Sequence, residues 1–150
     1  MTSASTGPAT GSTTGPAPAP VTNKAYGALV GIASLGILLQ GLWAGLFMAA
    51  WGGGGQSADT WEFVHARGAD VTLLVSVAAL VLAVTKLKAR RDLVVGTVVL
   101  VALLVLEYVL GSLMADAGAA SLTAVHVPLA MLLMAVAVWL PLRHRPRPVR

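Results

Sequence analysis

The chain has 150 residues, of which 57% are hydrophobic and only 11% are charged. In an ordinary soluble domain about a quarter of the residues are charged, so this composition excludes a typical water-soluble fold. The chain contains no cysteine, which excludes disulfides, thiolate zinc sites, iron–sulfur clusters and cysteine nucleophiles. Its net charge of +4 comes from short basic clusters between apolar runs, without the interleaved aromatic residues of an RNA binder, so nucleic acid is not an expected partner.

The N-terminal segment, residues 1–22, is built almost entirely from Ser, Thr, Gly, Ala and Pro and carries no charge. Such a composition buries too little apolar surface to offset the entropy of ordering, so we expect a disordered tail. The segment also lacks the positively charged region that precedes the apolar core of a signal peptide.

Four apolar runs follow this tail. The first, residues 25–50, contains no formal charge and is longer than the roughly 20 residues that cross a hydrocarbon core as a helix. The other three runs are 63–85, 93–115 and 117–142. Because short connections favour antiparallel neighbours, we expect an all-α integral membrane protein, an up-down bundle of four helices over residues 23–143.

The charged residues between the runs predict how the bundle lies in the membrane. The connection "KLKARR" and the basic tail over residues 144–150 are rich in Lys and Arg, whereas the other two connections carry Asp59, Glu62 and Asp116. By the positive-inside rule, both termini and the basic connection lie in the cytoplasm of a plasma membrane, with lipid around the spans. The richness in Ala, Val, Gly and Arg is typical of a high-GC bacterium.

The two halves of the chain resemble each other. "LLQGLWAGLFMA" aligns with "VLEYVLGSLMAD" and sets Gln40 beside Glu107, while "FVHARGADVTLLV" aligns with "AVHVPLAMLLMAV" and sets His65 beside His126. Both predicted hairpins begin and end on the same side, so they form parallel repeats related by a pseudo-two-fold axis along the membrane normal. We expect the axis to bring the two histidines towards each other in a polar layer in the outer half of the membrane.

Two neutral imidazoles on facing helices can hold a haem iron from opposite faces of the ring. The sequence therefore favours a b-type haem between His65 and His126. Room for the ring would come from small residues, namely Gly68, Gly111 and Ala130. The alternative is that both histidines are interfacial and bond water or a carbonyl, while the glycines simply allow close helix packing.

Glu107 is the most costly residue of the predicted layer, because an ionised carboxylate is expensive in hydrocarbon. Buried polar groups find hydrogen bonds, so we expect a neutral Glu107 that bonds to Gln40, Tyr108 or Ser112. The alternative places Glu107 and Gln40 at a haem edge, with Glu107 as a proton-transfer group.

Three further charged or titratable positions surround the predicted layer. Arg67 and Asp70 have the i,i+3 spacing of an interfacial ion pair, although Arg67 could instead hold a haem propionate. Glu62 precedes His65 by three residues, which puts both on one helix face. His144 lies in the basic tail, where we expect it to be solvated.

These residues resemble a known family. "WEFVHARGADVTLLV", with Glu62 three residues before His65, resembles the "E-x-x-H-R" start of a helix in haem A synthase. "LEYVLGSLMADAGAASLTAVHVPLAMLLMAV" is similar to the "L-Q-x-x-L-G…H-x-x-x-A" helix pair of that family. The family contains two four-helix halves with paired outer histidines, and this chain resembles one half over about residues 30–140. The resemblance implies that His65 and His126 ligate haem and that Glu62 matches the carboxylate implicated in oxidising a haem methyl group.

The chain departs from the family at three points, and several functions stay open. Its arginine follows His65 by two residues instead of one, Glu107 replaces the usual glutamine, and the outer loop has no cysteine. The pattern also resembles small uncharacterised actinobacterial four-span membrane proteins, which imply no activity. A haem protein for haem modification, haem handling or electron transfer, alone, as a homodimer or with a respiratory complex, is the leading hypothesis. A cofactor-free accessory or scaffold protein is the second, and a transporter is the third.

Overall fold

The computed structural model describes residues 22–53 and 57–145. The predicted disordered tail, except for its last residue, and residues 146–150 of the basic tail lie outside the described residues. Within the described ranges the chain is all-α and contains no strand. Its elements are α1 (Lys24–Gly52), α2 (Ser57–Lys86), α3 (Arg91–Asp116), the 3₁₀ helix η1 (Ala120–Leu122) and α4 (Thr123–His144).

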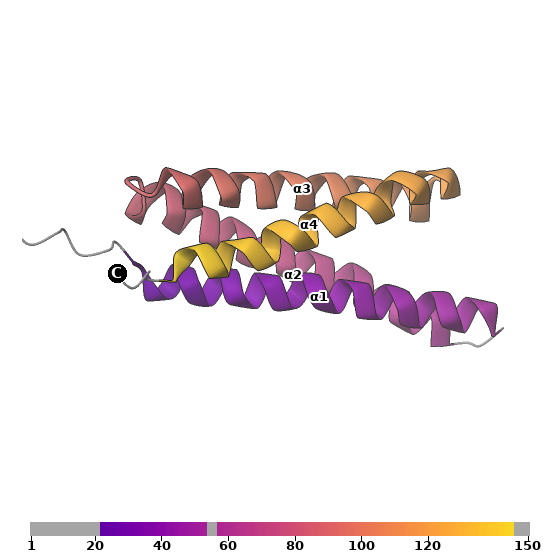
Figure 1. The fold of residues 1–150 in the computed structure, drawn as a ribbon. Helices are drawn as coiled ribbons and strands as arrows, with labels where there is room; N and C mark the ends of the chain where they lie inside the picture. Colours follow the sequence, from indigo (N-terminus) through magenta and orange to yellow (C-terminus); the bar gives the residue numbers. More distant parts are fainter. Residues whose placement is uncertain (1–21, 54–56, 146–150) are drawn as a thin grey trace, which may run out of the picture.

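The α-helices of the described chain form a four-helix bundle (Figure 1). Each of the four is long and apolar enough to cross a membrane, as the sequence predicts. The start of α1, the α2–α3 connection and the end of α4 lie at one end of the bundle, here called the terminal end. The end of α1, the start of α2 and the α3–α4 connection lie at the opposite, loop end, so successive helices run in opposite directions. The predicted all-α four-helix architecture is confirmed.

Two helices begin at positions that differ from the sequence-based boundaries. α2 begins at Ser57, well before the expected start at residue 63, and Asp59 in its first turn interacts favourably with the helix dipole. Glu62 therefore lies in a helix and not in a loop. α4 begins later than residue 117, because Gly118 adopts a positive φ of 64° and a 3₁₀ turn precedes the helix.

The pattern of burial follows the predicted internal repeat. Under the alignment that sets Gln40 beside Glu107, every buried residue of α1 falls on a buried residue of α3: Tyr26 on Leu93, Val30 on Thr97, Ala33 on Leu100 and Ile37 on Leu104. The alignment of the two histidines likewise places three buried residues of α2 on the three of α4: Thr72 on Leu133, Ser76 on Ala137 and Ala79 on Leu140. Both hairpins thus direct equivalent faces to the core.

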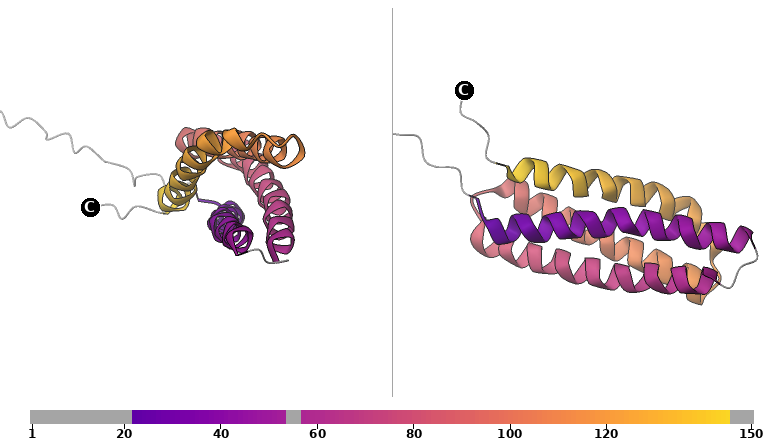
Figure 2. Two further views of the ribbon diagram at one scale, coloured as in Figure 1. Left: turned by 90° about the vertical axis from the view of Figure 1, so that its right-hand side faces the viewer. Right: turned by 90° about the horizontal axis from the view of Figure 1, so that it is seen from below.

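The helix arrangement has the same symmetry. α2 lies beside α1 at the loop end and beside α3 at the terminal end, while α4 starts beside α3 and ends beside α1 (Figures 1 and 2). The packed helix pairs of the described chain are α1–α2, α3–α4, α2–α3 and α1–α4. Exchanging the first hairpin (α1 and α2) with the second (α3 and α4) leaves this set unchanged, as a pseudo-two-fold axis requires.

The hydrophobic core lies in the terminal half of the bundle. Buried polar groups there are satisfied: the hydroxyl of Tyr26 is 2.7 Å from Oγ1 of Thr97, and Ser34 donates to the carbonyl of Ala137 at 2.7 Å. Towards the loop end the hairpins diverge, as the left view of Figure 2 shows. Beyond the level of the histidines, Ala58 is the one buried hydrophobic residue among those described. The core residues are Tyr26, Val30, Ile37, Ala79, Ala83, Leu87, Leu93, Leu100, Leu104, Leu133, Ala137 and Leu140.

An ion-pair cluster fastens α3 to α4 at the terminal end. Asp92 receives hydrogen bonds from Arg90 at 3.0 and 3.1 Å and from Nε of Arg143 at 2.8 Å. Arg90 also donates to the carbonyl of Arg143 at 3.0 Å. The hydrogen bond with Asp92 raises the pKa of the Arg90 guanidinium above its ordinary value.

The expectation that His144 is solvated is wrong. The end of α4 packs against the start of α1, where the backbone N–H of Asn23 donates to Nε2 of His144 at 3.3 Å. The imidazole also packs against Tyr26, with ring centroids 5.2 Å apart, and covers Gly27. His144 therefore belongs to the helix packing at the terminal end.

Candidate functional site

Four polar side chains lie at the level where the hairpins part, and we call them the polar layer: Gln40 on α1, His65 on α2, Glu107 on α3 and His126 on α4. The structure pairs them within hairpins. Gln40 contacts His65 in the first, and Glu107 contacts His126 in the second. These two pairs are equivalent positions of the internal repeat.

The first pair is a hydrogen bond to the backbone. Nδ1 of His65 lies 3.1 Å from the carbonyl oxygen of Gln40. A carbonyl only accepts, so Nδ1 carries the proton and donates, which leaves Nε2 unprotonated with a free lone pair. The ring edge of Phe47 packs against the imidazole, with centroids 5.5 Å apart, and helps to fix its orientation.

The second pair is an imidazole against a carboxylate. Nδ1 of His126 lies 2.6 Å from Oε2 of Glu107, a close contact that does not form a hydrogen bond in this structure. The expectation that Glu107 bonds to Gln40, Tyr108 or Ser112 is therefore wrong. α4 begins beside α3, which brings His126 to Glu107, and the carboxylate side chain is only 9% exposed.

The unsatisfied buried polar atoms of the described chain gather in this layer. They are Nε2 and Oε1 of Gln40, Oε1 of Glu107 and Nδ1 of His126, none of which has a hydrogen-bond partner among the described residues. Leaving one buried group unpaired costs about 1–3 kcal/mol, and such groups are rare in folded proteins. The polar layer therefore offers hydrogen-bonding capacity that the described chain does not use.

His65 lies on α2 and His126 on α4, two helices of the described chain that do not pack directly against each other. Within residues 22–53 and 57–145, no group of three or more His, Asp or Glu side chains is arranged to hold a metal ion. Two histidines suit an ion whose remaining ligands come from a macrocycle better than a bare ion, which takes three or four protein ligands.

Gly68 does not make room beside the histidines, contrary to the sequence-based expectation. A Cβ at this position would overlap the Trp43 ring and would lie 2.6 Å from Nε2 of Gln40, so α1 already fills the space. Gly68 lines a groove of about 420 Å³ between α1 and α2, whose lining includes neither His65 nor His126. Its small size serves the close packing of the first hairpin.

Gly111 and Ala130 differ from Gly68. The nearest atom to a Cβ at Gly111 would be Cε1 of His126, at 3.9 Å, so this glycine lies beside the imidazole with space to spare. Ala130 follows His126 by one turn of α4 and is half-buried. Both positions stay candidates for contact with a ligand of His126.

Arg67 forms the expected ion pair with Asp70, at 2.7 Å. Its side chain is 61% exposed and lies over the Phe63 ring, with the guanidinium carbon 5.8 Å from the ring centroid. Arg67 also lines the same outer groove as Gly68, so its contacts lie away from the histidines. Glu62 is half-buried, one turn from His65 towards the loop end, and forms no ion pair in the part of the chain that is described.

The pairing of Glu107 with His126 is the feature that sequence reasoning missed. A signal was present, because the repeat sets these residues at the positions of Gln40 and His65, at similar depth in one hairpin. The fold is that of a multi-pass membrane bundle. Each of its two hairpins holds one histidine against a polar group of the same hairpin. Comparisons of the chain with protein-family models, curated proteins and solved structures gave no match.

Proposed function

We propose that this protein binds one b-type haem between His65 and His126 and uses it in electron transfer, haem handling or haem modification. The observation that carries the proposal is the state of the two imidazoles. Nδ1 of each faces an oxygen atom from its own hairpin, a carbonyl for His65 and a carboxylate for His126, and Nε2 is left to bind.

The hydrogen bond of His65, and less completely the 2.6 Å contact of Nδ1 of His126 with Oε2 of Glu107, resemble the contacts of a metal-ligating histidine. Such a residue almost always donates its second ring N–H to a carbonyl or a carboxylate, which fixes the tautomer and raises the basicity of the ligating nitrogen. The alternative of interfacial histidines that bond water or a carbonyl also accounts for the contact of His65 with the Gln40 carbonyl. It gives no reason for a buried carboxylate beside His126 at the equivalent position of the repeat.

Packing also supports the proposal. The described helices share a core in the terminal half and diverge beyond the polar layer, where bundle surface lacks an apolar partner. A flat apolar macrocycle is a suitable partner, and the unpaired Oε1 of Glu107 is the group in the layer that could bond to its polar edge. The bound group would supply one-electron redox chemistry, while the chain orients it and limits access of water.

The proposal also covers the orientation of the bundle in the membrane and the role of Glu62. The basic connection and tail mark the terminal end, so we place the termini in the cytoplasm of a bacterial plasma membrane and the polar layer towards the outside. Glu62, one turn beyond His65, is the residue we assign to haem-methyl oxidation if the protein has that activity. A second copy or a respiratory-complex partner would then supply the half that the family resemblance implies.

An absorption spectrum tests the proposal. Protein purified in detergent from haem-replete cells should show a Soret band and, after dithionite, the sharp alpha band of low-spin bis-histidine haem. The double variant His65→Leu/His126→Leu should lose both bands. His144→Leu is the control, because it removes a partly buried imidazole that packs between helices outside the layer, and it should keep them. Colourless wild-type protein would contradict the proposal and leave a cofactor-free scaffold.

A further inference from the structure

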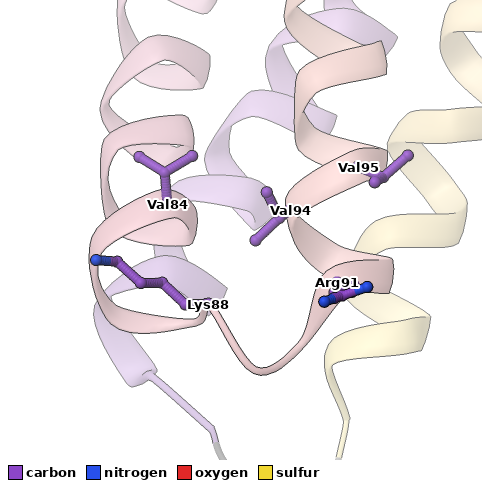
Figure 3. Close-up of a pocket in the computed structure, with 5 residues that line it drawn as sticks. All are labelled: Val84, Lys88, Arg91, Val94 and Val95. Carbon is purple, nitrogen blue, oxygen red and sulfur yellow. The ribbon is translucent and has the colours of Figure 1, made fainter.

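A groove of about 240 Å³ lies between the end of α2 and the start of α3 (Figure 3). Its lining combines three valines with two cations and contains no carboxylate: Val84, Lys88, Arg91, Val94 and Val95. We propose that this groove binds an anionic phospholipid, with the phosphate at Lys88 and Arg91 and an acyl chain along the valines. The site is separate from the polar layer and does not depend on haem binding.

The two cations are available for a ligand, unlike two neighbouring arginines. Arg90 and Arg143 are already bonded to Asp92. Lys88 and Arg91 are exposed, and neither forms an ion pair or a side-chain hydrogen bond with the described residues. Arg91 also opens α3, so the positive end of that helix dipole adds to the attraction for an anion.

The lining changes from apolar to basic along the membrane normal. Val84 is 41% exposed and Val95 is 60% exposed, on the apolar parts of α2 and α3 that face lipid. Lys88 and Arg91 lie nearer the connecting loop, on either side of the groove (Figure 3). A small soluble anion would not contact the three valines, whereas a phospholipid has a charged part for the cations and an apolar part for the valines. Basic pockets between membrane helices are a recognised form of anionic lipid site.

Native mass spectrometry of the detergent-purified full-length protein tests this site. Phosphatidylglycerol and phosphatidylcholine with identical acyl chains serve as probes, and the wild type should retain the anionic lipid preferentially. Each cation near a membrane surface contributes about 1 kcal/mol to anionic lipid binding, so Lys88→Gln/Arg91→Gln should weaken phosphatidylglycerol binding about 30-fold. The control Lys86→Gln/Arg145→Gln removes two exposed charges from the same end without touching the groove, and it should retain the preference.

A second variant separates the groove from its charge. Val84→Trp fills the apolar wall at an exposed position and leaves both cations in place, so it should lower lipid retention while the net charge stays the same. Circular dichroism checks that each variant keeps its helix content. Equal loss of binding in both charge variants would indicate a general surface potential and overturn the proposal. Equal retention of the two lipids by the wild type would overturn it as well.

Discussion

The two hairpins bury equivalent positions but place different chemistry on them. In the first, His65 bonds to a neutral backbone carbonyl, and Gln40 contributes an amide side chain. In the second, His126 meets the carboxylate of Glu107. The repeat thus fixes where the polar groups lie, while the residue types have diverged. Two histidines related by symmetry need not be equal ligands, because a carboxylate partner makes an imidazole more basic than a carbonyl does.

The hairpins also differ in how tightly they close. In the first, the Trp43 ring of α1 packs directly against Gly68 of α2, so these two helices are close together near the level of His65. In the second, a glycine contacts a tryptophan at a non-equivalent position, Gly96 with Trp139 near the terminal end, and Gly111 beside His126 is open. The first hairpin is therefore closed at the polar layer and the second is not.

Single alanine substitutions of the two histidines should show the largest difference between the hairpins. His126→Ala removes the more basic ligand and should abolish stable haem binding. His65→Ala should retain five-coordinate, high-spin haem on His126. Haem content by pyridine haemochrome assay and the position of the Soret band measure both. Equal loss in the two variants would show that the carboxylate does not distinguish the ligands.

Glu107→Gln sharpens the comparison, because it gives the second hairpin the polar residue of the first. Loss of a partner of this kind typically costs 10–100-fold in metal affinity, so we expect haem affinity to fall by about that factor. The reduction potential should rise, since an amide at this position raises the basicity of the His126 imidazole less than a carboxyl group does. Gln40→Ala, which removes the amide side chain but leaves the carbonyl that bonds His65, should change the potential much less. A potential unchanged by Glu107→Gln would contradict the assigned role.

Glycine-to-alanine substitutions test the difference in packing without any cofactor. Gly68→Ala should destabilise the bundle by about 1–3 kcal/mol, because its Cβ has no space against the Trp43 ring. Gly111→Ala meets nothing closer than 3.9 Å and should be neutral or stabilising, since alanine is favoured over glycine in helices by up to about 1 kcal/mol. Thermal unfolding in detergent compares the two. Similar losses of stability would mean that the two hairpins are equally closed.

The four-helix fold could be predicted from the sequence, and its pseudo-two-fold symmetry could be predicted from the internal repeat. Apolar runs of membrane-spanning length, separated by charged connections, predicted the helices, and the alignment of Gln40 with Glu107 carried over to the buried positions of α1 and α3. These features depend on local composition and on periodicity, which a single sequence displays directly.

The contacts across helices were harder to predict. Spacing alone suggested that Gly68 serves the histidines, whereas the rotation of α2 against α1 turns it to Trp43. The repeat and proximity in the chain suggested Gln40, Tyr108 or Ser112 as the partner of Glu107, whereas the start of α4 brings His126 to it. The basic sequence around His144 predicted a solvated side chain, whereas α4 packs the imidazole against Tyr26. Each error concerns helix rotation and crossing, which depend on packing across the whole bundle.

Asp92→Asn should produce the smallest effect and should weaken the second hairpin alone. Asp92 joins Arg90 to Arg143 at the terminal end, whereas the repeat places Ala25 at the equivalent position of the first hairpin. The carboxylate side chain is 25% exposed, so its loss should cost only about 0.5–1 kcal/mol of unfolding free energy. Salt screens such pairs, and the difference in melting temperature from the wild type should therefore shrink as ionic strength rises. Asp116→Asn, at the loop end of the same helix, is the matched control; it removes a negative charge from a helix C-terminus and should cause no loss of stability at any salt concentration. A deficit that persists in high salt would show that Asp92 acts through packing and not through charge.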